Sequence, residues 1–177
     1  MKKERVCVNI RQEQLADYDE VYDLVKASFS TSTDDGEWDY LNDVRKKDTF
    51  IPELSLVAIN DENKIVGQVV LYETNITTPH MIVTELVLSP ICVHPHYFRR
   101  GIARAMMERA FVLAAELGYT AVFLCGNPDF YHKMGFVASY EFGIYHIADG
   151  THSAECCMAL ELKKGALQDI WGTICIQ

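Results

Sequence analysis

Apolar residues in the first third of the chain follow two different periods, and each period predicts one type of secondary structure. Alternation with polar neighbours predicts a strand over residues 6–10. Recurrence every three or four residues predicts an amphipathic helix over residues 15–29, starting at Leu15, and a short second helix around Trp38. A polar loop over residues 30–36 separates these two helices.

The middle of the chain is rich in strand-forming residues. Strands are expected at residues 54–59 and 65–72, and the polar segment between them predicts a hairpin. A longer strand is expected over residues 82–93. We expect it to be interrupted at Ser89–Pro90 by a bulge, because proline has no N–H group for a ladder hydrogen bond.

The second half begins with a helical pattern over residues 101–117. Its apolar face comprises Met106, Ala110, Leu113 and Leu117, and Gly118 is expected to end it. The remaining elements are a buried strand at 121–125, a short helix at 129–134, and strands at 155–162 and 172–176. This order predicts a mixed α/β domain built around one sheet.

Composition is that of an ordinary globular protein, with 49% hydrophobic and 23% charged residues among 177. No linker or repeat divides the chain, so we expect a single domain over residues 1–177. The net charge of -9 disfavours nucleic acid as a partner, because such binding relies on neutralising phosphates with Lys and Arg. It is compatible with a cationic substrate.

The cysteines indicate a reducing compartment. They form no C-x-x-C pair, which predicts neither a zinc site nor a disulfide framework. No secretion signal and no apolar run of membrane-spanning length is visible, so we expect a cytoplasmic protein without a membrane partner. The six are Cys7, Cys92, Cys125, Cys156, Cys157 and Cys175.

A basic turn at the start of the helix at 101–117 favours an anion site. The first N–H groups of a helix have no intrahelical partner, and the helix dipole attracts negative charge there. Gly101 and Ala103 are small enough to let a phosphate approach, and Arg99, Arg100 and Arg104 add positive charge. A solvated basic turn before a surface helix is the alternative interpretation.

A second motif follows the next strand, and the two motifs together indicate a family. V-x-P-x-[YF]-x-x-R-G-I-A over residues 93–103, then a helix, a strand and Y-x-x-x-G-F over residues 131–136, resemble the GNAT superfamily of N-acetyltransferases. The form G-N-P-x-F-Y-x-x-x-G-F resembles its small predicted prokaryotic-type branch. The resemblance implies a mixed, mostly antiparallel central sheet flanked by helices, acetyl-CoA as cosubstrate, and direct attack by a primary amine.

The resemblance also assigns roles to individual residues. The strand at Ile91, Cys92 and Val93 would carry the pantetheine arm on its backbone, with a contact from Asn127. Tyr131 would protonate the departing thiolate. The loop and helix start that would hold the pyrophosphate comprise Arg99, Arg100, Gly101, Ile102, Ala103 and Arg104. Phe98 departs from the family pattern, which has Gln or Arg three residues before the first motif glycine.

Glu85 is the candidate general base, on the same strand as Val93. An exposed strand carboxylate or a water-relayed base is the alternative. A packed aromatic ring is the alternative for Tyr131. The rival to an enzyme is a non-catalytic acyl-CoA-binding sensor or partner-regulating module, which has no need of a donor at the thiolate.

The remaining candidates receive simpler interpretations. His94 and His96 are read as loop residues and not as a metal pair, so no metal is expected. Cys92 and Cys125 are read as core residues and not as nucleophiles. Surface loops are the simpler interpretation for His146 and His152, and the loop around residues 30–39 is either a substrate lid or a connector. The expected partner is a small-molecule or peptide amine, with the chain a monomer or homodimer.

Overall fold

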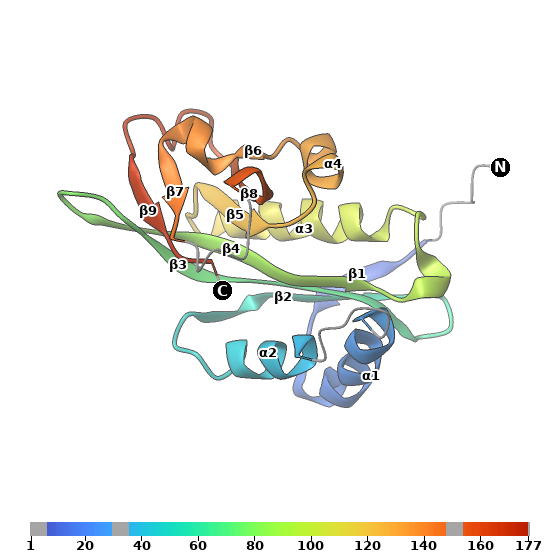
Figure 1. The fold of residues 1–177 in the computed structure, drawn as a ribbon. Coiled ribbons are helices and arrows are strands. Elements are labelled where there is room, and N and C mark those ends of the chain that lie inside the picture. The colour runs from blue at the N-terminus through green and yellow to red at the C-terminus, as the bar shows by residue number, and fades with distance from the viewer. Residues whose placement is uncertain (1–6, 30–35, 148–153, 177) are drawn as a thin grey trace. The chain divides into compact units, whose positions relative to one another are not determined.

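The computed structural model describes residues 7–29, 36–147 and 154–176. In these ranges nine strands form one mixed, mostly antiparallel sheet, and helices flank it, which confirms the predicted fold class (Figure 1). The strands are β1 (Asn9–Gln12), β2 (Phe50–Ile59), β3 (Ile65–Thr77), β4 (Ile82–Val93), β5 (Ala121–Cys125), β6 (Val137–Ala138), β7 (Ile144–His146), β8 (Cys157–Glu161) and β9 (Gly172–Ile174). The α-helices are α1 (Tyr18–Phe29), α2 (Glu37–Val44), α3 (Ile102–Glu116) and α4 (Pro128–Tyr131).

The chain packs as two compact units. The first comprises residues 1–72 and 89–113, and the second comprises residues 73–88 and 114–177. Strands β3 and β4 and helix α3 each contribute residues to both units. Within the described residues, no helix combines the length and the apolar character that a membrane crossing requires.

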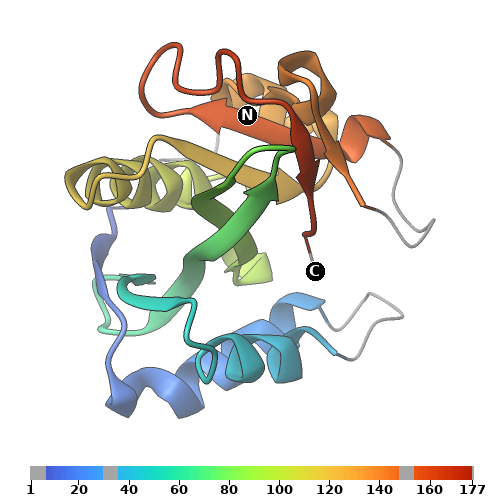
Figure 2. The same ribbon diagram turned by 90° about the vertical axis from the view of Figure 1, so that its left-hand side faces the viewer.

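Helices cover both faces of the sheet in the first unit, where β1, β2 and β3 pair antiparallel. On one face α3 approaches β3 so closely that a Cβ on Gly67 would lie 2.8 Å from Cε of Met106. Strand side chains alternate between faces, so Tyr72 lies on the other face, where its hydroxyl hydrogen-bonds the Tyr40 hydroxyl of α2. Helices α1 and α2 run side by side on that face (Figure 2).

The second unit is organised around β5. Its first four residues are buried, as in a strand covered on both faces. It pairs in parallel with β4 at Leu86 and Val87, and antiparallel with β8 over its whole length, from Ala121–Glu161 to Cys125–Cys157. Strand β7 pairs with β9, which pairs with the end of β3.

The first turn of the chain differs from the predicted helix. Leu15 is 81% exposed and lies in a short 3-10 turn, so it is not part of the apolar face that periodicity assigned to it. The Asp17 carboxylate accepts a hydrogen bond from the Gln14 backbone and binds the Arg11 guanidinium, and α1 begins at Tyr18. A polar network therefore sets this helix start.

Two predictions further along need correction. Strand β4 runs continuously from Ile82 to Val93, with a cis Ser89–Pro90 peptide where an interruption was expected. Helix α3 ends at Glu116, and Leu117 is exposed. Its buried face comprises Ile102, Met106, Met107, Ala110 and Ala114. Small alanines on this face let the helix approach the sheet.

An ion pair ties α2 to the start of the first unit. The Arg45 guanidinium binds the Glu13 carboxylate, and their side chains are only 6% and 1% exposed. The Ser55 hydroxyl donates to the same carboxylate at 2.7 Å. Removing the cation would leave a buried carboxylate that has lost its counter-charge.

We therefore expect Arg45→Met to lower the free energy of unfolding by about 3–5 kcal/mol, because breaking one partner of a buried pair is strongly destabilising. Lys46→Met is the control, since Lys46 pairs with Asp43 at 74% and 66% exposure and should change stability by less than about 0.5 kcal/mol. Urea denaturation measures both. Equal effects of the two substitutions would contradict the role assigned to Arg45.

Candidate functional site

The loop between β4 and α3 has a backbone shape that few residues adopt. Arg99 has φ +62° and Gly101 has φ +86°, both in the left-handed region. A Cβ on Gly101 would meet no atom within 4 Å, so the glycine is favoured there by its φ angle and not by crowding. The loop leaves open space beside the first turn of α3.

That space is a hollow of about 290 Å³ on the first unit, lined in part by Arg100, Gly101 and Arg104, with Glu108 also in its wall. No acidic residue lies in the first turn of α3. The Arg104 ion pair with Glu108, at 3.5 Å, is exposed and therefore weak. The positive end of the helix and two arginines thus face one hollow, which is the electrostatic arrangement that binds anions.

Arg100 is held in place at this junction. Its guanidinium lies over the Tyr97 ring, 5.4 Å from the ring centre. Its Nε is buried and has no hydrogen-bond partner among the described residues. A buried N–H donor of this kind is costly unless something accepts its hydrogen bond. Phe98, at the departing position of the family motif, is 46% exposed.

The end of β4 lies in the same unit as this junction. Cys92 and Val93 are buried, and the Val93 carbonyl accepts a hydrogen bond of 3.2 Å from Ser28 Oγ of α1. The His94 ring nitrogen Nδ1 accepts from the His96 backbone, so these two histidines organise the loop locally. Cys92 has the burial expected of a core residue.

Helix α4 of the second unit begins after Asn127, its N-cap, and ends at Tyr131. The Asn127 side chain accepts a hydrogen bond of 2.9 Å from the Asp129 backbone N–H and so caps the helix. The Tyr131 ring packs edge-on against Phe130 and Phe136. The helix cap therefore fixes Asn127, and the contacts with two phenylalanines fix the Tyr131 ring.

Glycine is required beside Tyr131. A Cβ on Gly126 would lie 2.3 Å from Cε2 of the Tyr131 ring. The ring therefore occupies the space that any other side chain at this position would need. Burial raises the pKa of Tyr131 to about 12, so its phenol is protonated at neutral pH.

Glu85 is buried in the second unit, and its carboxylate is already occupied. Its oxygens accept hydrogen bonds from the Thr120 hydroxyl and from the backbone N–H groups of Thr120 and Ala121, the latter two at 3.0 Å. The side chain thereby anchors the start of β5. Three donors on one carboxylate favour a structural role over that of a proton acceptor.

The structure groups the predicted residues into two sets. The residues expected to hold the pyrophosphate lie together at one loop–helix junction of the first unit, while Asn127, Tyr131 and Glu85 belong to the second. His146 lies at the end of β7, where Nε2 is 3.0 Å from the Ile176 carbonyl. His152 and residues 30–35 lie outside the described ranges.

One cluster of side chains in the second unit was not predicted from the sequence. Cys125, His146 and Cys157 present ligand atoms within 4.8 Å of one another. The two sulfurs are 2.9 Å apart although the cysteines are separated by 32 residues. Only the pairing of β5 with β8 makes them neighbours, and sequence spacing carries no signal of it.

A comparison with protein-family models identifies the family. The model of the acetyltransferase (GNAT) domain matches residues 9–138. A search of curated proteins finds no match. The chain is similar to the solved structure of the GNAT family N-acetyltransferase YhbS from Escherichia coli in complex with CoA, with a TM-score of 0.85, 24% identity, and 100% of this chain and 93% of that one covered.

A second similar structure is a GNAT family acetyltransferase from Brucella melitensis in complex with acetyl-CoA. Its TM-score is 0.75 at 18% identity, covering 97% of this chain and 96% of that one. Similarity at these identities establishes the fold. Two relatives with this fold were therefore solved with CoA or its acetyl thioester bound.

The hydrogen bonds of Glu85 generate a stability prediction. Glu85→Gln places an amide N–H₂ group opposite the N–H donors of β5, so we expect a loss of about 1–3 kcal/mol in the free energy of unfolding. Glu53→Gln, at an exposed position of β2, is the control and should be nearly neutral. Chemical denaturation gives both values, and an unchanged Glu85→Gln stability would argue against the anchoring role.

Proposed function

The chain belongs to the GNAT acetyltransferase family, and from that premise we propose that it transfers the acetyl group of acetyl-CoA to a primary amine by direct attack. The observation that carries the proposal is the anion site at the start of α3, where a left-handed glycine, two arginines and the N-terminal end of the helix face one hollow. An acyl donor carrying a pyrophosphate fits this arrangement.

In the proposed complex, the pyrophosphate lies against the backbone of Gly101, Ile102 and Ala103. Arg100 and Arg104 supply counter-charge, and the buried Nε of Arg100 gains an acceptor. The pantetheine arm follows the backbone of Ile91, Cys92 and Val93, with Asn127 as a further contact. A backbone N–H of this strand would polarise the thioester carbonyl as an oxyanion donor.

The reaction forms a bond between the amine nitrogen and the acetyl carbon, and breaks the bond from that carbon to sulfur. Tyr131 is proposed as the acid that donates to the departing sulfur. Its pKa of about 12 lies above the ~8.5 of an ordinary thiol, so complete proton transfer from the phenol alone is uphill. The hydroxyl therefore stabilises the thiolate by hydrogen bonding, and the net proton for the thiol comes from the attacking amine.

A base must accept a proton from the amine as it attacks. The occupied carboxylate of Glu85 favours a water relay for this step, and Glu85 itself supports the active site by holding the start of β5. Orientation of the amine and stabilisation of the oxyanion would supply most of the rate acceleration. The acceptor is a small-molecule or peptide amine.

The first test of this function is binding. We expect Arg100→Glu and Gly101→Val to weaken acetyl-CoA binding in calorimetry by tenfold or more, since each removes phosphate attraction or access. Arg109→Glu is the charge control, because Arg109 lies further along α3. Gly118→Val is the backbone control, because Gly118 has φ +97° and equally open surroundings. Absence of acetyl-CoA binding at millimolar ligand would refute the proposal.

The second test separates an enzyme from a binding module. Tyr131→Phe keeps the ring, so acetyl-CoA affinity should be retained while kcat falls on the order of 10²-fold with an accepted amine. Because the phenol pKa is about 12, kcat of the parent enzyme should show no alkaline decline from this group below pH 10. Tyr140→Phe, at an exposed tyrosine, is the control. Parent-like turnover by Tyr131→Phe would exclude the residue from the mechanism.

A further inference from the structure

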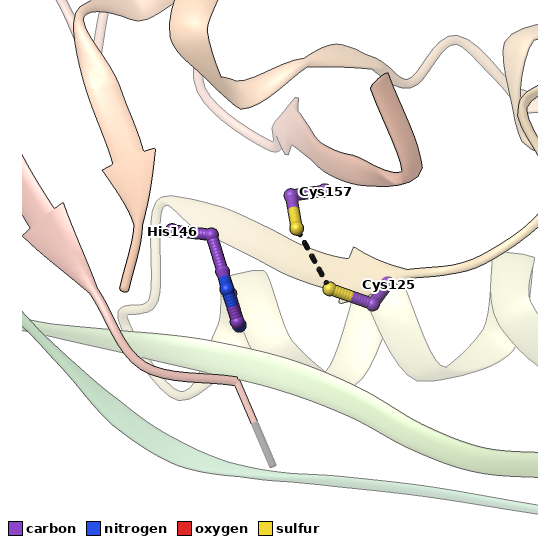
Figure 3. A group of neighbouring side chains, drawn as sticks. All are labelled: Cys125, His146 and Cys157. Carbon is purple, nitrogen blue, oxygen red and sulfur yellow. Dashed lines mark hydrogen bonds between the residues drawn. The ribbon is translucent and has the colours of Figure 1, made fainter. Parts of the chain in front are cut away.

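Two cysteines and a histidine from three strands meet in the second unit. The Sγ atoms of Cys125 and Cys157 are 2.9 Å apart, and these atoms and a ring nitrogen of His146 all lie within 4.8 Å of one another (Figure 3). We propose that this cluster, the Cys125 cluster, is a binding site for a thiophilic divalent cation of the zinc type. The proposal is independent of the acetyl transfer proposed above.

The strand register brings the two thiols together. Cys125 of β5 is directly opposite Cys157 of β8. The next pair along the ladder is hydrogen-bonded through the Gly126 N–H and the Cys156 carbonyl, at 2.9 Å. The cysteines therefore form the non-hydrogen-bonded type of pair, in which side chains of antiparallel strands approach most closely. The backbone register therefore places the two cysteine side chains next to each other.

His146, the third ligand, is held by contacts with the Ile176 backbone. The Ile176 N–H donates a hydrogen bond of 3.1 Å to His146 Nε2, and the Ile176 carbonyl lies 3.0 Å from the same nitrogen. Metal binding through Nδ1 would require the ring proton to move to Nε2, which would then donate to the carbonyl. Histidines that bind metals commonly donate their other ring N–H to a backbone carbonyl in this way, which sets the tautomer and the ring orientation.

The donor set selects the cation. Two sulfurs and an imidazole nitrogen suit zinc, which binds Cys at about 2.3 Å and His at about 2.0–2.1 Å in tetrahedral geometry. Two such zinc–sulfur bonds place the sulfurs about 3.8 Å apart, so the thiols must separate by about 0.9 Å. Small side-chain rotations provide this. Three protein ligands leave the fourth position to a water molecule.

Burial raises the pKa of both thiols above the usual range, so a cation must displace their protons in order to bind. Binding of a divalent ion would convert both to thiolates and release two protons, leaving the buried site neutral. Zinc affinity should therefore rise with pH.

The site would join two parts of the second unit. Strand β7 is paired with β9 in the described structure, whereas Cys125 and Cys157 belong to the β5–β8 ladder. A metal would cross-link them without a backbone ladder. Cys125 also directly precedes Gly126 and Asn127, so the ion would steady the segment that leads to Tyr131. The sequence predicted no metal because no C-x-x-C pair marks these cysteines.

Metal uptake by the full chain tests the proposal. The protein is reduced, stripped with a chelator, exchanged into chelator-free buffer and titrated with Co²⁺ and then Zn²⁺. We expect one ion per chain, a thiolate-to-cobalt charge-transfer band that zinc abolishes, and a rise in melting temperature with zinc. Because the band reports sulfur ligation in the parent protein, its absence overturns the proposal without any variant.

Variants then locate the site. Cys125→Ala, Cys157→Ala and His146→Ala should each lose stoichiometric uptake and the zinc-dependent rise in melting temperature. Cys7→Ala and His80→Ala, at exposed positions, should keep both. Uptake that survives Cys125→Ala and Cys157→Ala would overturn the proposal. So would a reduced parent protein that takes up no metal and forms only a Cys125–Cys157 disulfide on exposure to oxidised glutathione.

Discussion

The left-handed backbone at Arg99 and Gly101 is the constraint on which the anion site depends. It turns the chain from β4 into α3, so the N-terminal end of the helix, with its positive dipole, lies beside open space. A residue with a Cβ is strained at φ +86°, and a straighter loop would direct the same N–H groups elsewhere. The arginines add charge to a geometry that the backbone has already created.

The helix that carries this site is held by packing. Met106 of α3 contacts the sheet where Gly67 leaves room for it, and small alanines continue the same face. Such a close fit resists sliding of the helix along the sheet, because protein interiors leave few voids. A rigid helix start is what a phosphate site needs, since its N–H donors act only when they are correctly placed.

Periodicity predicted most of the fold, and the motifs predicted the family. Long patterns such as those of β3 and α3 fix an element's type, and the motif around Gly101 together with Y-x-x-x-G-F predicted the family, which the family model confirms. Strands β6 and β7 are two and three residues long, too short for a period to be visible. Leu15 was misplaced because a carboxylate, not an apolar face, determines where α1 begins.

Contacts between side chains that are distant in the sequence could not be predicted from the sequence. Glu85 reads as a strand carboxylate, and only the pairing of β4 with β5 shows that it holds Thr120 and Ala121. The Cys125 cluster likewise depends on register across 32 residues. Contacts of this kind follow from which strands become neighbours, a property that no local spacing encodes.

Because Gly126 has no side chain, the residues tolerated at positions 126 and 131 depend on each other. Since the Tyr131 ring fills the space where a Cβ would be, a larger residue at 126 becomes tolerable only if the ring moves or shrinks. Substitutions at these two positions are therefore epistatic. Replacing Tyr131 by a smaller residue would allow residues larger than glycine at position 126. Mutational drift at this glycine is blocked for as long as the aromatic ring is retained.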